Sequence, residues 1–302
     1  MALTARGRRT RVIVVAVAAV AVVGTGAALL LAALGGTVVV TERCTATVEG
    51  GEHSLAPDQA ANAATIAAIS VQRGLPARAA TIGIATAIQE SKLRNIDYGD
   101  RDSVGLFQQR PSQGWGTVEE IMDPVYAINA FYDVLVEIEG YQALEITDAA
   151  QRVQRSAFPG AYGDHEPEGR AFASALTGYS TAALTCRLRT AGDLTVQEVA
   201  GNGVTPRAQA VLDAAQLAYG DLDAAPASDD GTTLAITTPD GDAGTRQGWS
   251  LTQWAVASAD ALDVVRVVVD SQQWQRGSSD EGWVAAESSP SGEVLIEVAA
   301  GT

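Results

Sequence analysis

Several residue types are scarce in this 302-residue sequence, and each scarcity excludes a class of site. The chain has only two cysteines and two histidines, His53 and His165. They lie far apart and give no spacing recognisable as a zinc site. Lys and Arg total 20 against 36 Asp and Glu, for a net charge of −16, and the phosphates of nucleic acid require Lys and Arg. We therefore expect neither a metal site nor a nucleic-acid partner, and we interpret the charge as supporting solubility.

Charged residues are missing from one long stretch near the start of the chain. Residues 12–40 contain no charge, and the most apolar part, 12–34, is long enough for one bilayer crossing at about 1.5 Å per residue. Four arginines within residues 1–11 favour a cytoplasmic N-terminus and extracytoplasmic main domains. This pattern predicts a single-pass protein of the cell membrane. Secretion after signal cleavage is the alternative, because Ala32 and Ala33 supply small residues, although the apolar run exceeds a usual signal core.

The two cysteines, Cys44 and Cys186, form an even and widely spaced pair. In an oxidising compartment such a pair predicts one disulfide, and two free thiols are the alternative. The loop so closed would span about 140 residues, for which the chain-entropy model gives about 4 to 5 kcal/mol of stabilisation.

Length and composition allow two modest domains, since 47% of the residues are hydrophobic. Apolar periodicity predicts successive helices over 59–73 and from about Ala77, with no strand signal between them. The short polar stretch that precedes them contains a Gly-Gly pair and is typical of a linker. The predicted parts are a cytoplasmic tail (1–11), a membrane helix (12–34), a juxtamembrane linker (35–54), a helical domain (55–188), a second linker (189–204) and a small α/β domain (205–302).

One helix end carries the strongest candidate for chemistry. The helix from Ala77 delivers Glu90 near its last turn, and the Gly-Leu-Phe-Gln segment at 105–108 then supplies apolar bulk and an amide. Such surroundings raise the pKa of a Glu and keep it protonated, as a general acid acting on a glycosidic oxygen requires. The plainer alternative is a solvated Glu at a helix end.

The Glu90-Ser91 pair followed by Gly-Leu-Phe-Gln resembles the Glu-Ser and Gly-Leu-Met-Gln pattern of lytic transglycosylases and goose-type lysozymes, with Phe107 in the Met position. The third block of that family, a helix rich in small and aromatic residues, has a counterpart at 123–135, and the similarity spans residues 57 to 165. The resemblance implies a lysozyme-like domain that cleaves the β-1,4 bond between MurNAc and GlcNAc in peptidoglycan. Glu90 would be the general acid and then the base, and no cofactor would be needed.

Five further residues are candidates for substrate binding. The resemblance implies that Ser91, Gln108 and Gln109 hold the carboxylate or the sugar amides by hydrogen bonds. Trp115 follows in a loop that contains Pro and Gly, where it would either stack on a sugar ring or pack against the protein. Tyr162 belongs to an Ala-Tyr fragment of the Ala-Tyr-Asn-Ala-Gly block, whose Tyr lines the active site in many lytic transglycosylases.

The loop between the two motifs contains three candidates for a second carboxylate, Asp97, Asp100 and Asp102. A hydrolase would use one of them to activate water or to stabilise an oxocarbenium-like state, and the sequence does not choose among them. A solvated turn is the alternative interpretation. A transglycosylase needs no second carboxylate, because the C6 hydroxyl of the sugar attacks, so both outcomes stay open.

The pattern changes after Cys186. A helix is predicted from Thr205 to about Ala218 and another from Ser250 to about Leu262. The segment 248–255, Gly-Trp-Ser-Leu-Thr-Gln-Trp-Ala, resembles a C-terminal module of actinobacterial cell-wall proteins, some members of which look like zinc D-Ala-D-Ala peptidases. No histidine follows His165, so the resemblance implies a degenerate peptidase-like module without a His-ligated zinc. Strands are predicted at 234–238, 264–270, 283–286 and 294–298.

These patterns together predict an α+β protein with an N-terminal transmembrane helix, a mainly α lysozyme-like domain and a small α/β domain. The expected partners are peptidoglycan and, through the N-terminal helix, the cytoplasmic membrane, and the sequence indicates nothing about protein partners. The alternative function is a non-catalytic cell-wall-binding or scaffolding protein in which neither domain does chemistry.

Overall fold

The computed structural model describes residues 41–48, 51–155, 160–287 and 292–301. The predicted cytoplasmic tail and the membrane helix at 12–34 lie outside these ranges. Within them, no helix is both long enough and apolar enough to cross a membrane. The longest, α9 (Gly241–Ala257), has 17 residues and contains Asp, Arg, Gln and Thr, whereas a crossing takes about 20 mostly apolar residues. The predicted fold class is therefore corrected to α+β without a membrane-spanning helix in the described part of the chain.

The segment predicted as a polar linker forms two strands. β1 (Arg43–Val48) pairs with β2 (Gly51–Leu55) and with the distant β3 (Leu184–Arg187), all antiparallel. Cys44 and Cys186 are direct neighbours in the β1–β3 pairing, and the predicted disulfide between them is confirmed. The linker prediction was wrong because β1 is stabilised by pairing with β3, far away in sequence, which local periodicity does not reveal.

Six helices lie in the first half of the described chain, and the two predicted over 59–73 and from about Ala77 are among them. The central one is α3, in which every side chain from Ala79 to Ile88 is buried. Gly83 lets α2 approach closely, because a Cβ there would lie 2.9 Å from the Cγ2 of Ile66. The helices are α2 (Pro57–Gln72), α3 (Ala77–Ser91), α4 (Val118–Met122), α5 (Pro124–Val136), α6 (Ile146–Gln154) and α7 (Glu166–Leu176), with short 3-10 turns at 111–113, 141–143 and 163–165.

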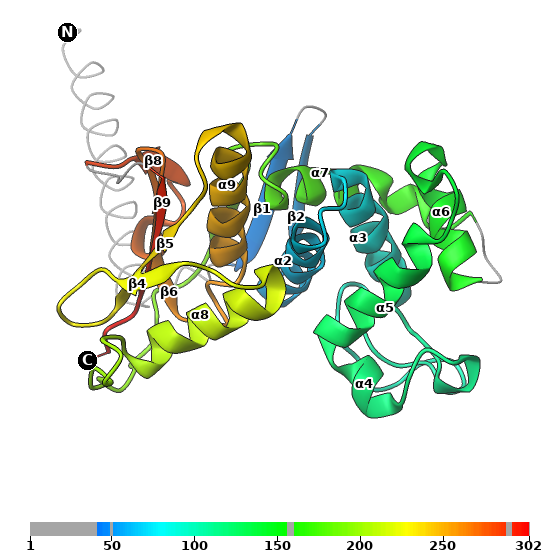
Figure 1. Ribbon diagram of the computed structural model, residues 1–302, viewed down its shortest axis with the longest axis horizontal. Coiled ribbons are helices and arrows are strands. Elements are labelled where there is room, and N and C mark those ends of the chain that lie inside the picture. The colour runs from blue at the N-terminus through cyan, green and yellow to red at the C-terminus, as the bar shows by residue number, and fades with distance from the viewer. Residues whose placement is uncertain (1–40, 49–50, 156–159, 288–291, 302) are drawn as a thin grey trace, which may run out of the picture. The chain divides into compact units, whose positions relative to one another are not determined.

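The second half is built on an antiparallel sheet with the strand order β4-β5-β9-β6-β7-β8. Figure 1 shows α9 standing beside this sheet, which it contacts through β6 and β9. The four predicted strands form as β5, β6, β8 and β9, whereas β4 and β7 were not predicted, and α9 begins nine residues before the predicted Ser250. The elements are α8 (Pro206–Tyr219), β4 (Ala224–Pro226), β5 (Thr233–Thr237), β6 (Val264–Val269), β7 (Gln272–Gln275), a 3-10 turn at 276–278, β8 (Trp283–Ala285) and β9 (Glu293–Val298).

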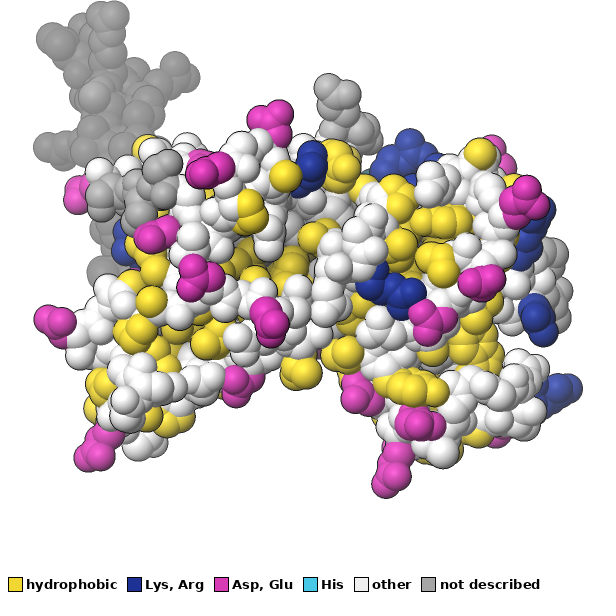
Figure 2. Space-filling model, viewed as in Figure 1, with side chains coloured by type: hydrophobic (Ala, Val, Ile, Leu, Met, Phe, Trp, Pro, Cys, Tyr) yellow, Lys and Arg dark blue, Asp and Glu magenta, His cyan; other side chains and the backbone are white. Residues whose placement is uncertain are grey.

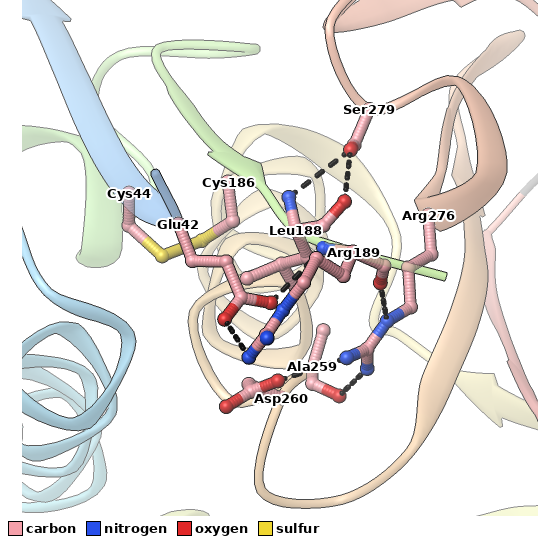
Figure 3. A network of polar contacts seen from close by, with 9 residues as sticks. All are labelled: Glu42, Cys44, Cys186, Leu188, Arg189, Ala259, Asp260, Arg276 and Ser279. Atoms are coloured by element: carbon pink, nitrogen blue, oxygen red, sulfur yellow. Dashed lines mark hydrogen bonds and ion pairs between the residues drawn. A yellow bond between two sulfur atoms is a disulfide. The ribbon is translucent and has the colours of Figure 1, made fainter. Parts of the chain in front are cut away.

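A polar network ties the second half to the segment that follows β3. Arg276 donates hydrogen bonds to the carbonyl oxygens of Arg189 (2.7 Å) and Ala259 (2.8 Å) and to Asp260 (2.8 Å). Figure 3 shows these contacts beside the Cys44–Cys186 disulfide and an ion pair between Glu42 and Arg189. The described residues from Thr41 onward form one compact unit.

Candidate active site

Glu90 lies in the last turn of α3, on the wall of a cavity of about 430 Å3. Burial raises the pKa of its carboxyl group, while hydrogen bonds from the side chains of Tyr162 and Gln154 oppose part of this increase. The net result is a pKa above the ordinary value for Glu, because the surroundings penalise the charged form more than the two donors stabilise it. The predicted catalytic residue is therefore a partly buried carboxyl that faces a cavity.

Tyr162 is in direct contact with Glu90. Its hydroxyl donates a hydrogen bond of 2.6 Å to Oε1 of Glu90, and its side chain is 1% exposed. The two residues are 72 positions apart in sequence. Tyr162 precedes the 3-10 turn Gly163–His165, which leads into α7, and α7 packs along α3. The fragmentary Ala-Tyr motif thus places a hydroxyl against the candidate acid.

The Gly-Leu-Phe-Gln segment supports Glu90 from the side of the core. The hydroxyl of Ser91 donates to the carbonyl oxygen of Leu106 at 2.7 Å and so joins the end of α3 to this segment. Phe107 is buried and stacks on Phe131, with 4.5 Å between ring centroids. Gly105 has φ +81°, and a Cβ there would lie 2.8 Å from the carbonyl oxygen of Ile121. The motif requires glycine at this position for both reasons.

Of the three residues predicted to hold substrate by hydrogen bonds, two reach the cavity. Gln108 lines it and has φ 48°, and its Nε2 donates weakly to the carbonyl oxygens of Tyr98 and Gly105 at 3.3 Å each. Gln109 also lines it, and its Nε2 donates to the carbonyl oxygen of Ala127 at 3.1 Å. Ser91 is 7% exposed, is not among the lining residues and makes the backbone contacts of a positioning residue.

The structure separates the three candidate aspartates. Asp100 lines the cavity and is exposed, with Arg101 at 3.9 Å. Hydrogen bonds from the hydroxyl and the backbone N–H of Ser112, and from Arg110, lower the pKa of Asp102, which therefore anchors the loop as a carboxylate.

Asp97, the third candidate, is exposed and is not among the described residues that line the cavity. Asp100 is thus the one predicted aspartate that the structure brings to the same cavity as Glu90.

Trp115 is half-buried and stands between two hollows. It lines the Glu90 cavity and an adjoining one of about 400 Å3, and Gln113, Gln154 and Arg155 also line both. It also packs against the hydrophobic core. Both predicted roles of Trp115, stacking on a sugar and packing against the protein, are compatible with this position.

Several lining residues were not predicted. Gln154 and Arg155 come from the end of α6, more than sixty residues after Glu90, and the Nε2 of Gln154 also donates to the carbonyl oxygen of Phe107 at 2.7 Å. No local pattern marks a Gln or Arg at a helix end as part of a site, and only the packing of α6 on α3 brings them in. The unpredicted lining residues are Arg101, Ser103, Arg110, Gln113, Gln154 and Arg155.

The chain matches no family model, and the comparison with curated proteins found no match. The resemblance to lytic transglycosylases therefore rests on the motifs alone. Among the described residues, no group of three or more His, Cys, Asp or Glu side chains could hold a metal ion.

Proposed function

We propose that this protein cleaves the β-1,4 bond between MurNAc and GlcNAc in peptidoglycan, with Glu90 as the general acid. The observation that carries the proposal is a partly buried carboxyl with a raised pKa on the wall of a cavity, in hydrogen-bond contact with a buried tyrosine. A solvated surface Glu would have neither feature. The Cys44–Cys186 disulfide agrees with a protein that works outside the cytoplasm, where its substrate would be.

Two opposing effects on the pKa of Glu90 suit it to act first as a general acid and then as a base. Burial keeps its proton in place until a glycosidic oxygen can accept it, and the Tyr162 hydroxyl stabilises the carboxylate that remains after the transfer. The same carboxylate then takes up a proton from the attacking hydroxyl, because an acid that has lost its proton is a base for the next step. Tyr162 and Gln154 also fix the orientation of the carboxyl group through their hydrogen bonds.

The cavity offers groups suited to amino sugars. The lining residues Gln108 and Gln113 carry side-chain amides, which can pair with the acetamido groups of MurNAc and GlcNAc, whereas the amide of Gln109 is buried against the carbonyl of Ala127. Trp115 presents an aromatic face where the two hollows meet, and such faces stack on the C–H surface of a sugar ring. Two adjoining hollows of about 430 and 400 Å3 suit sugars on the two sides of a scissile bond.

Of the two possible reactions, hydrolysis and transglycosylation, the environments of Asp100 and Asp102 favour transglycosylation. Asp102 is engaged by Arg110 and Ser112, and Asp100, although it lines the cavity, is exposed to solvent and has no hydrogen bond that would hold its carboxylate toward Glu90 among the described residues. Attack by the C6 hydroxyl of the sugar requires no second protein carboxylate, whereas attack by water in an inverting hydrolase does. We therefore expect products with an anhydro ring and expect that Asp100→Asn retains most of the activity.

Mass spectrometry of purified peptidoglycan incubated with the full chain tests this function. Glu90→Gln should lower the cleavage rate by at least about 100-fold, since it removes the proton but keeps the shape. Glu139→Gln, which makes the same charge change at an exposed carboxylate, should leave the rate unchanged. Reducing-end products in place of anhydro products would indicate a hydrolase. Absence of any product, with sedimentation of the protein on the glycan, would indicate a binding protein.

A further inference from the structure

A second concave surface lies between the two halves of the described unit. It consists of two adjoining hollows of about 410 and 250 Å3, which share Ala77 and Tyr179. We call it the seam groove. It shares no lining residue with the two hollows beside Glu90. Its polar lining includes Gln72, Arg78, Arg170, Tyr179, Arg246 and Gln247.

The seam groove is basic in a chain that is otherwise acidic. None of its described lining residues is Asp or Glu, although the whole sequence has 36 acidic residues against 20 basic ones. Three arginines line it, of which Arg170 is paired with Glu166. Figure 2 shows magenta acidic side chains spread over this face of the molecule, with dark-blue groups near α7 and α9. A ligand that enters the groove therefore meets positive charge.

Arg246 is the cation of the larger hollow. Its guanidinium carbon lies 5.0 Å from the centroid of the Tyr179 ring, and the Tyr179 side chain is itself 60% exposed. No ion pair or hydrogen bond occupies the Arg246 side chain within the described residues. A cation–π contact uses none of the guanidinium N–H groups as hydrogen-bond donors, and the planar edge of a guanidinium matches a carboxylate with two parallel hydrogen bonds.

The Arg246–Tyr179 pair is held in place by the backbone beneath it. Gly178 has φ +77°, and a Cβ there would lie 1.9 Å from the carbonyl oxygen of Arg246, so the turn after α7 presses directly on α9. The hydroxyl of Ser250 donates to the carbonyl oxygen of Leu176 at 2.6 Å, and Gln253 donates to that of Ala175 at 2.7 Å. A binding surface fixed in this way loses little entropy when a ligand is bound.

Two primary amides flank the cation. The side chains of Gln72 and Gln247 line the larger hollow and form no hydrogen bonds to other described residues. Each offers two donors and an acceptor, a set that pairs with the N–H and C=O groups of a peptide. In the smaller hollow the Nε of Arg78 is a buried donor without a partner in the described residues. The groove thus combines a free guanidinium edge, free amides and an exposed aromatic ring.

We propose that the seam groove binds the carboxylate-bearing stem peptides of peptidoglycan, as an accessory site separate from the Glu90 cavity. Peptide amides would pair with Gln72 and Gln247, and a peptide carboxylate with Arg246. The assignment of the peptide to peptidoglycan rests on the proposed function. The preference for a carboxylate rests on the residues that line the groove. A polyphosphate chain would require a row of free cations, but the larger hollow presents Arg246 alone among its described lining residues.

Calorimetric titration of the full chain carrying Glu90→Gln tests this site without interference from cleavage. The probe is the free-acid stem tetrapeptide released from peptidoglycan by an amidase, and the comparison is the same peptide amidated at every carboxylate. We expect Arg246→Gln to weaken binding of the free acid by about tenfold or more, as for loss of a charged hydrogen-bond pair. Arg246→Lys should also weaken it, because an ammonium lacks the planar fork. Arg187→Gln removes an exposed charge outside the groove and should have no effect.

Equal binding of the amidated and free-acid peptides, unchanged affinity in Arg246→Gln, or tighter binding of an oligomeric glycerol phosphate would each overturn the proposal. Cleavage assays separate it from the function of Glu90. With Glu90 intact, Arg246→Gln should slow cleavage of peptide-bearing glycan and leave cleavage of peptide-free glycan unchanged. A wild-type chain that cleaves neither substrate but binds the free acid through Arg246 would support the groove and refute the glycosidase.

Discussion

The helical half and the sheet half of this protein treat a buried ionisable group in opposite ways. In the sheet half, Arg276 is 7% exposed, and each of its nitrogen atoms donates to an oxygen, two of them backbone carbonyls and one a carboxylate. In the helical half, the Glu90 carboxyl is partly buried without a cationic partner among the groups that shift its pKa. A buried charge with all its hydrogen-bond partners stabilises a fold, whereas an incompletely compensated one is available for proton transfer.

The largest expected effect on stability comes from the disulfide. Its two cysteines are 142 residues apart in sequence, and the whole helical half lies between them. Replacing both Cys44 and Cys186 by Ala should lower the free energy of unfolding by about 4 to 5 kcal/mol in the chain-entropy model. Urea denaturation measures the loss. Hydrogen exchange resolved by region should show protection lost first from α2 to α7. Equal loss of protection in the sheet half would mean that the disulfide stabilises both halves to the same extent.

Disruption of the Arg276 network should have the next largest effect on stability. Arg276→Met should cost about 3 kcal/mol of stability, because it leaves the carbonyl oxygens of Arg189 and Ala259 buried without their donor. Arg187→Met, at an exposed position of β3, should change stability by less than about 0.5 kcal/mol. Denaturant midpoints of the two variants give the contrast, and similar midpoints would remove the structural role of Arg276.

Tyr162→Phe should change the pH dependence of activity. The hydroxyl of Tyr162 lowers the pKa of Glu90 by stabilising the carboxylate, so its removal raises that pKa further. The alkaline limb of the profile of kcat/KM against pH should therefore move to higher pH, and kcat should fall by about tenfold as the carboxylate loses a charged hydrogen bond. Tyr98→Phe, at an exposed tyrosine, is the matched control. An unmoved alkaline limb would contradict the assigned contact.

Glu90→Gln should have the smallest effect on stability, and of opposite sign to Arg276→Met. The pKa of Glu90 is higher in the folded state than in the unfolded chain. Protonation of Glu90 therefore stabilises the fold fully when the pH is below the pKa of the unfolded chain, and this stabilisation is lost as the pH rises through the pKa of the folded state. The variant should therefore melt at a higher temperature than the wild type at pH 7. The difference should shrink as the pH falls below the ordinary range of Glu. A lower melting temperature at pH 7 would show that Glu90 is structurally compensated.

Much of the candidate site was visible in the sequence because it is local. Glu90 follows an apolar helix pattern, and Gln108 and Gln109 follow a glycine that the backbone requires, so chain order alone assembles one wall of the cavity. Gln154, Arg155 and the strand β1 were missed for a common reason. Their partners lie tens of residues away, and a polar residue at a helix end or a short alternating run has many other uses.

The sequence by itself determined α2, α3 and α5 of the first half, four of the six strands of the second sheet (β5, β6, β8 and β9) and the one disulfide that two cysteines allow, because periodicity and capping residues act over short stretches. Tertiary structure decided the rest. It brought Tyr162 to 2.6 Å from Glu90, committed Asp102 to Arg110, and left Arg246 in a groove without an acidic partner among the described residues. Burial and pairing are properties of three-dimensional neighbours, so the pKa of a carboxyl and the freedom of a guanidinium are fixed only when the chain is folded.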